Sequence, residues 1–248
     1  MALREELEKQ GNWLFRWRSY MPLLFIPVLL LALPQAAYFE RQAGQWAANC
    51  WAALCLFISF AGLGVRIVTI GYAPRRTSGR NTREQKAETL NTTGMYSLVR
   101  HPLYVGNCLM ILGVALAAEV WWFAGLVSLV LWLYYERIIF AEEEFLRGKF
   151  GADFLAWALR TPAFLPRFEN WQPAHLPFSV KTVLKREYSG FFGLIAAFTG
   201  LELAVNLFVQ GKLSLAGGWI VFFSAGLIIY LTLRALKRKT TWLRVEGR

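Results

Sequence analysis

The side chains best suited to chemistry gather first in the stretch GMYSLVRHPLYVGN, residues 94–107. It places Arg100, His101 and Tyr104 at the start of an apolar segment, around Pro102. Because proline is tolerated in the first turn of a helix, Pro102 predicts that a helix begins here. A helix start presents unpaired backbone N–H groups and the positive end of the helix dipole. With Arg100 and His101 beside it, this helix start suits the binding of a carboxylate.

A second group of side chains is acidic, since Glu142, Glu143 and Glu144 follow the next apolar segment. The two apolar segments are separated by little more than Glu119, so they are expected to form a helical hairpin. Their far ends then lie close together, and a basic and an acidic cluster meet across one pocket. Either cluster alone also fits a structural interpretation, in which Arg-His-Pro anchors the interface and the glutamates form a solvated helix start.

The composition indicates that membrane helices position these residues. Of 248 residues, 56% are hydrophobic and 17% are charged, and the formal net charge is +11. Soluble domains are about 45–50% apolar and about 25% charged. This composition excludes a largely disordered chain, and three cysteines exclude a disulfide scaffold. The sequence predicts an all-α, polytopic helical membrane protein.

Six apolar segments approach the roughly 20 residues that a membrane-spanning helix needs. They lie at about residues 21–39, 46–70, 102–118, 120–140, 190–209 and 215–236. We therefore expect about six transmembrane helices, of which the first is bent by three prolines and the third is short. Apolar residues at helical spacing after residue 140 predict a further, cytoplasmic helix, broken near Gly148 or Gly151.

The basic residues predict the orientation, because cytoplasmic loops carry an excess of Lys and Arg. With six spans, all of the 27 Lys and Arg except Arg41 and Lys212 fall on one side, so both termini are expected in the cytoplasm. This asymmetry accounts for the net charge, and nucleic acid is not an expected partner. The bilayer is, and a basic face also attracts anionic headgroups and substrates.

We divide the chain into three parts: residues 1–20, 21–168 and 169–248. The first is expected to be an interfacial helix, since its aromatic residues lie among basic ones. A cleavable signal peptide is the competing interpretation, but its n-region would be too long and too acidic. The second part is the core, and the third adds two helices. Glu202 and Asn206 in the third part mark either a functional intramembrane carboxylate or a hydrogen-bonded packing contact.

Other cofactor and metal sites are not expected. The three cysteines have no ligand spacing with the two histidines, so no metal site is predicted. The glycines at 62 and 64 lie inside an apolar segment and lack the third glycine of a dinucleotide-binding fingerprint.

The two chemical motifs resemble those of the isoprenylcysteine carboxyl methyltransferase family, which is related to the phospholipid methyltransferases. GMYSLVRHPLYVG resembles the signature G-x-Y-x-x-x-R-H-P-x-Y-x-G at every defined position. EEEFLRGKFGADFLAW, followed by FLPRF, resembles E-E-x-x-L-x-x-x-F-G-x-x-Y-x-x-Y, with Phe154 and Trp157 in place of two tyrosines. These replacements keep aromatic bulk and lose two hydroxyls. The resemblance covers about residues 45–168.

The resemblance implies a membrane methyltransferase that binds S-adenosylmethionine on the cytoplasmic side without a Rossmann fold. Carried over by position, it implies the following cofactor-binding residues: His101, Tyr104, Glu142, Glu143 and Tyr96. We assign catalytic roles to Arg100 and Glu143, with Arg100 orienting either the acceptor or the carboxylate of the cofactor. The ammonium and ribose hydroxyls of the cofactor suit the glutamates.

The expected acceptor is the polar end of a lipid or a prenylated small molecule. The basic face favours O-methylation of a carboxylate over N-methylation of a phospholipid amine, and a lipid phosphate is a third candidate. A transporter or sensor that uses the same pocket for a ligand is the alternative from another class, against which the intact motifs argue. We expect a multi-pass protein, in the inner membrane of a bacterium, with its active site facing the cytoplasm.

Overall fold

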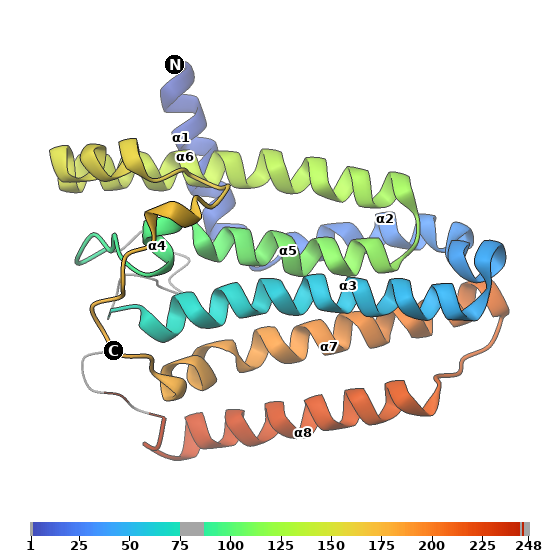
Figure 1. Ribbon diagram of the computed structural model, residues 1–248. Coiled ribbons are helices and arrows are strands. Elements are labelled where there is room, and N and C mark those ends of the chain that lie inside the picture. Colours follow the sequence, from blue (N-terminus) through green and yellow to red (C-terminus); the bar gives the residue numbers. More distant parts are fainter. Residues whose placement is uncertain (1, 75–86, 244, 246–248) are drawn as a thin grey trace.

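The computed structural model describes residues 2–74, 87–243 and 245, and within these ranges it contains helices and no strand. Figure 1 shows the long helices lying side by side in one bundle. They are α3 (Tyr38–Tyr72), α5 (Pro102–Ala117), α6 (Trp121–Arg160), α7 (Val180–Gln210) and α8 (Gly217–Lys239). Each contains one of the predicted apolar segments, so the all-α prediction is confirmed.

Four of these helices, α3, α6, α7 and α8, are long and apolar enough to cross a membrane. Helix α5 is also apolar, but its 16 residues extend about 24 Å, less than a hydrocarbon core of about 30 Å. A bent pair of N-terminal helices raises the number of candidate spans to five. The described residues therefore form a multi-pass protein with four or five candidate spans, fewer than the six expected.

The predicted first span, residues 21–39, is divided rather than continuous. It consists of η1 (Met21–Leu24), α2 (Phe25–Ala32) and η2 (Leu33–Gln35). Pro22 and Pro34 each lie at the start of a short 3-10 helix. Because proline has no N–H and clashes with the preceding turn, it starts a helix more readily than it continues one. This segment meets α1 (Leu3–Trp17), the helix predicted for residues 1–20, at an angle of 90°.

Two glycines interrupt the longest helices. Gly44 (φ 80°) breaks α3 near its start, and Gly151 (φ 52°, ψ −120°) breaks α6 beyond the glutamates. Both backbone conformations favour glycine, because a Cβ is strained at positive φ. The break at Gly151 is one of the two positions predicted from the sequence.

The chemical motifs lie at one end of the bundle. In Figure 1, α3, α6 and α8 end at the same end at which α5 and α7 begin. The segments that join α3 to α5 and α6 to α7 therefore lie together there. This arrangement agrees with the predicted grouping of basic residues, whereas the side of the membrane stays a prediction.

Close packing between α3 and α5 holds the helix that carries the first motif. A Cβ added at Gly106 would lie 2.6 Å from Arg66 Cγ, and one at Gly62 would lie 2.5 Å from the Gly106 carbonyl oxygen. Small residues thus let the two backbones approach closely, as is common between membrane helices. The Ser59 hydroxyl donates a hydrogen bond to the Met110 carbonyl oxygen at 2.9 Å, which further fixes α5 on α3.

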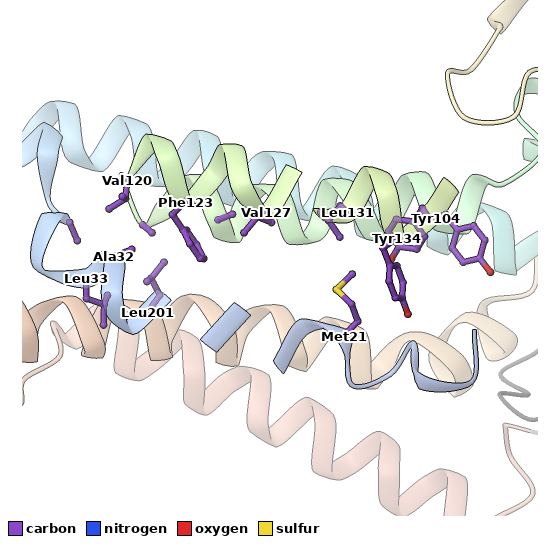
Figure 2. Close-up of a cluster of buried hydrophobic side chains, with 14 of the residues drawn as sticks. Met21, Ala32, Leu33, Tyr104, Val120, Phe123, Val127, Leu131, Tyr134 and Leu201 are labelled. Atoms are coloured by element: carbon purple, nitrogen blue, oxygen red, sulfur yellow. The ribbon is translucent and has the colours of Figure 1, made fainter. Parts of the chain in front are cut away.

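A buried apolar cluster joins α6 to the N-terminal segment and to α7 (Figure 2). Its members include Met21, Leu33, Phe123, Val127, Leu131, Tyr134 and Leu201. At one end the cluster reaches Tyr104, so apolar packing borders the first chemical motif.

The C-terminal extension is divided between an inner and an outer helix. Helix α7 packs against α3 and α5, whereas α8 packs on α7. Every apolar side chain of α8 is at least partly exposed, as expected of a helix surrounded by lipid. The boundaries of the three-part division stay a prediction, but α7 is an integral part of the bundle.

Candidate functional site: an acid–base cluster between α5 and α6

The first motif folds as a short turn that leads into α5. Gly94 (φ 61°) precedes the one-turn helix α4 (Met95–Leu98), and His101 is the residue before Pro102, with which α5 begins. The predicted helix start at Pro102 is confirmed. His101 and Tyr104 therefore lie at the N-terminal end of α5, where the backbone N–H groups of the first turn have no partner within the helix.

The chain that follows α6 is hydrogen-bonded along this turn. The backbone N–H of Arg100 donates to the Pro162 carbonyl oxygen at 2.9 Å, and that of His101 donates to Ala163 at 3.3 Å. In return, the Arg167 N–H donates to the Leu98 carbonyl oxygen at 3.0 Å. The proline-containing end of the second motif thus supports the backbone of the first.

Glu143 of α6 lies between two basic side chains of the first motif. Its carboxylate accepts hydrogen bonds from Arg100 Nε (2.8 Å) and Nη2 (3.2 Å). Its Oε1 also lies 3.0 Å from His101 Nε2. A bidentate arginine–carboxylate pair fixes orientation as well as charge, so Glu143 holds α5 and α6 together at this point.

Glu142, the preceding residue, contacts the other functional side chains of α5. Its Oε1 accepts a hydrogen bond from the Tyr104 hydroxyl at 2.6 Å, and its Oε2 lies 3.5 Å from His101 Nδ1. The imidazole therefore lies between two carboxylates, and it stacks on the Tyr104 ring with 5.8 Å between centroids. The predicted pairing of the two clusters is confirmed in its geometry.

The third glutamate belongs to another contact. Glu144 pairs with Arg4 of α1 and lies 3.4 Å from Arg147. It thus attaches the N-terminal helix to α6 and does not join the cluster of His101 and Tyr104.

Arg100 uses most of its N–H groups within the protein. Besides Glu143, it donates from Nη1 to the carbonyl oxygens of Ala158 (2.9 Å) and Thr161 (2.5 Å). These carbonyls lie at the C-terminal end of α6, which a cation stabilises. Arg100 therefore joins the end of α6 to Glu143, and its predicted contact with a ligand stays a prediction.

Burial and charge act on His101 in opposite directions. Burial lowers the pKa of this imidazole, but its hydrogen bonds with Glu142 and Glu143 and their negative charges raise the pKa more. The net effect is a pKa above the ordinary value for histidine. The two carboxylates therefore stabilise a positive charge on the imidazole at the start of α5.

Tyr96 lies beside the cluster rather than in it. Burial and the charge of Glu142 raise the pKa of its hydroxyl, so the phenol is neutral near pH 7. Its carbonyl oxygen accepts a hydrogen bond from Trp157 Nε1 at 3.1 Å. Trp157, which replaces a tyrosine of the motif, thus retains a polar contact, while Phe154 is fully buried against it.

The cluster suits a ligand that carries both a positive and a negative charge. Glu142 and Glu143 are each 23% exposed in their side chains, so their oxygens remain accessible beyond the contacts described. Carboxylates accept hydrogen bonds from ammonium and hydroxyl groups, whereas His101 and the start of α5 favour an anion. The arrangement can hold opposite charges a few ångströms apart.

Comparison with known proteins places this geometry in a family. The family model described as phospholipid methyltransferase matches residues 51–153, which contain both clusters. The nickel-cobalt-cadmium resistance protein NccN of Alcaligenes xylosoxydans xylosoxydans is 37% identical over 158 residues, 63% of this chain and 68% of NccN. The chain belongs to the phospholipid methyltransferase family.

Two further proteins are similar to this chain over shorter stretches. The cobalt-zinc-cadmium resistance protein CzcN of Cupriavidus metallidurans is 40% identical over 135 residues, 54% of this chain and 57% of CzcN. A protein-S-isoprenylcysteine O-methyltransferase of Schizosaccharomyces pombe is 33% identical over 85 residues, 34% of this chain and 36% of that enzyme. The alignment with CzcN thus spans just over half of that protein, and no solved structure matches the chain.

One polar group of this methyltransferase-family chain was not predicted from its sequence. Arg66 of α3, Asn107 of α5 and Glu187 of α7 form a hydrogen-bonded group beyond the two motifs. The sequence did offer one signal for this group, since Arg66 is a charged residue inside an apolar segment. Its partner Glu187 could not be identified, because it lies 121 positions away. Glu202, which the sequence singled out instead, accepts a long 3.5 Å hydrogen bond from Asn206 one turn later.

Proposed function

We propose that this chain is a membrane-embedded, S-adenosylmethionine-dependent methyltransferase that methylates a carboxylate at the polar end of a lipid or prenylated molecule. The observation that carries the proposal is the joining of Glu142 and Glu143 of α6 to His101 and Tyr104 of α5. Membership of the phospholipid methyltransferase family and similarity to a yeast isoprenylcysteine methyltransferase support the reaction class.

The donor set fits the amino-acid end and the ribose of the cofactor. In this proposal Glu142 and Glu143 accept hydrogen bonds from the ammonium group or the ribose hydroxyls. The start of α5 and the charge of the nearby His101 imidazole attract the carboxylate of the cofactor. Tyr96 borders the same pocket with a neutral phenol. Arg100 fixes Glu143 and, in this proposal, orients either the acceptor or the carboxylate of the cofactor.

The cofactor, when bound, supplies a methyl group on a positively charged sulfur. The residues of the chain then have to hold an acceptor oxygen in line with that methyl group. Alignment of this kind contributes up to about 7–11 kcal/mol. Tyr104 and Tyr135 are buried, so one side of the acid–base cluster is removed from water. A carboxylate acceptor needs no general base, which agrees with a cluster whose histidine favours the protonated state.

The positive charge at the end of the bundle that carries the site favours an anionic acceptor. Basic residues predominate in the segments predicted to be cytoplasmic, and they raise the local concentration of anionic substrates. A phospholipid amine and a lipid phosphate are the alternative acceptors. In this proposal the site faces the cytoplasm, with both termini on the same side.

Transfer of a labelled methyl group from S-adenosylmethionine into a total lipid extract tests the proposal. Base treatment of the product should release the label as methanol, because an ester is hydrolysed. Label that resists base would indicate an amine acceptor. Wild-type protein that neither binds the cofactor in detergent nor transfers the label would contradict the enzyme and favour a transporter or sensor. The substitutions His101→Ala and Glu143→Ala should abolish binding.

The names of the two bacterial relatives suggest a physiological setting for this chemistry. NccN and CzcN are named for resistance to nickel, cobalt, zinc and cadmium. We propose that methylation by this chain contributes to tolerance of such ions. Metal-sensitive cells that express the wild type should then grow at higher concentrations of these ions than cells that express His101→Ala. Equal growth of the two strains would contradict a role of this methylation in metal tolerance.

A further inference from the structure

A buried ion pair joins the C-terminal extension to the core. Arg66 of α3 donates from Nε to Glu187 Oε2 and from Nη2 to Glu187 Oε1, both at 2.8 Å. The Glu187 side chain is 4% exposed and that of Arg66 is 18% exposed, so the pair is largely removed from solvent. Glu187 lies outside the matched residues 51–153 and belongs to α7.

The same guanidinium reaches the helix of the first motif. Arg66 Nη1 donates a hydrogen bond to Asn107 Oδ1 at 2.6 Å. The stem of Arg66 lies against Gly106, where a Cβ would approach its Cγ to 2.6 Å. A glycine at 106 is therefore required for the arginine to lie flat on α5. Arg66 thus contacts α5 through both its stem and its charged end.

Asn107 leads from this pair to the acid–base cluster. It lies three residues after Tyr104, on the same face of α5. Its side chain also lies close enough to Tyr135 of α6 to interact with it, and the Tyr135 ring packs on Tyr104 with 4.9 Å between centroids. The series of contacts therefore runs from Glu187 through Arg66 and Asn107 to the tyrosine that binds Glu142.

We propose that Arg66 and Glu187 are positioning residues of the methyltransferase site, through which α7 sets the position of α5 along α6. The pair places Asn107, and with it the distance from Tyr104 to Glu142 and from His101 to Glu143. The C-terminal extension thereby takes part in cofactor binding without touching the cofactor. This inference rests on the proposed function of the site.

If the pair of Arg66 and Glu187 had a purely structural role, a different result would be expected. An ion pair that serves only to hold α7 in the bundle affects stability, and cofactor affinity follows only when the fold fails. Replacing one partner of a buried pair leaves an uncompensated charge, whereas replacing both removes that penalty. A double substitution therefore separates stability from positioning.

The experiment uses the full chain purified in detergent, with S-adenosylmethionine as the probe. Melting temperature and cofactor Kd are measured for Glu187→Gln, for Arg66→Lys and for the double variant Arg66→Gln with Glu187→Gln. Glu202→Gln is the matched control, because it makes the same change on the same helix outside this group. The KM values for cofactor and acceptor are compared for every variant that transfers methyl groups.

We expect Glu187→Gln to lower the melting temperature and to raise the Kd at least about tenfold. The double variant should regain melting temperature while its Kd stays high, because Asn107 has lost its partner. Arg66→Lys should be intermediate in Kd, and the KM for the cofactor should rise more than that for the acceptor. Glu202→Gln should bind like the wild type.

Two results would overturn the inference. One is a Kd that stays at the wild-type value in all three variants, and the other is a Kd that recovers with melting temperature in the double variant. Wild-type protein that binds no cofactor would instead contradict the proposed function itself. The two failures are therefore distinguishable in one set of measurements.

Discussion

The carboxylate of Glu143 receives both the Nε and the Nη2 hydrogen bonds of Arg100, at 2.8 and 3.2 Å. The same guanidinium holds two carbonyl oxygens at the end of α6. Arg100 is therefore oriented from two directions by other groups of the chain. This relationship makes Glu143 the residue through which the arginine, the histidine and α6 are aligned.

Glu143→Gln should weaken both the fold and the cofactor site. It leaves the Arg100 guanidinium without its charged partner, and the side chain of Arg100 is only 14% exposed. Because the pair is partly accessible to water, we expect a loss of about 2 kcal/mol in the free energy of unfolding. Affinity for S-adenosylmethionine should fall at least about tenfold. Thermal unfolding and calorimetric titration in detergent measure the two effects.

Glu144→Gln is the matched control for this change. It alters the adjacent residue of α6, whose partners Arg4 and Arg147 are exposed. We expect cofactor affinity to stay at the wild-type value. A Glu144→Gln protein that loses affinity as strongly as Glu143→Gln would show that the acidic run acts through its total charge.

Apolar run length explains most of the fold that could be predicted from the sequence. Each of α3, α5, α6, α7 and α8 contains one predicted segment, because a helix that faces lipid or a buried interface needs a continuous apolar stretch. The N-terminal segment differs, since its prolines divide a run whose hydropathy alone suggests one span. Helix α5 was expected to be short, and its 16 residues are fewer than the roughly 20 of a typical span.

The site was predictable where two motifs carry it and unpredictable where distant helices meet. The pairing of His101 with Glu142 and Glu143 followed from the helical hairpin. The pairing of Arg66 with Glu187 depends on how α7 packs against α3, and no local pattern in the sequence encodes that packing. The contact of Glu144 with α1 was missed for the same reason.

Tyr104→Phe should weaken cofactor binding while leaving the apolar packing intact. It removes the hydroxyl that donates to Glu142 at 2.6 Å, and a hydrogen bond to a charged group contributes about 1.5–3 kcal/mol. We expect affinity for S-adenosylmethionine to fall about tenfold. Tyr134→Phe is the control, because its hydroxyl donates to the Leu14 carbonyl oxygen at 3.0 Å and serves only the contact with α1. Equal affinities in the two variants would argue against a role for the Tyr104 hydroxyl.

Stability should depend on pH through His101. Its pKa is raised in the folded chain by Glu142 and Glu143, which together outweigh burial. A raised pKa contributes stability that is fully present below the unfolded value of about 6.5 and is lost as pH rises through the folded value. The melting temperature of the wild type relative to His101→Gln should therefore decrease as pH rises above about 6.5.

The other histidine provides the control for this pH effect. His175→Gln alters an exposed side chain in the segment between α6 and α7. The same pH series measured on this variant shows which changes arise from the substitution of a histidine as such and which from His101. A difference in melting temperature between the wild type and His101→Gln that does not change with pH would contradict the raised pKa of His101.

Gly106→Ala should displace α5 from α3 and thereby disturb the site from a distance. The added Cβ would lie 2.6 Å from Arg66 Cγ and 2.7 Å from the Gly62 carbonyl oxygen, so one helix or the arginine has to move. Overpacking of this kind costs about 1–3 kcal/mol. Gly125→Ala on α6 is the matched control, because nothing lies within 4 Å of the added Cβ. It should raise stability slightly, by up to about 1 kcal/mol, since alanine favours a helix. Melting temperatures in detergent distinguish the two, and a Gly106→Ala protein as stable as the wild type would mean that α3 and α5 do not need this close approach.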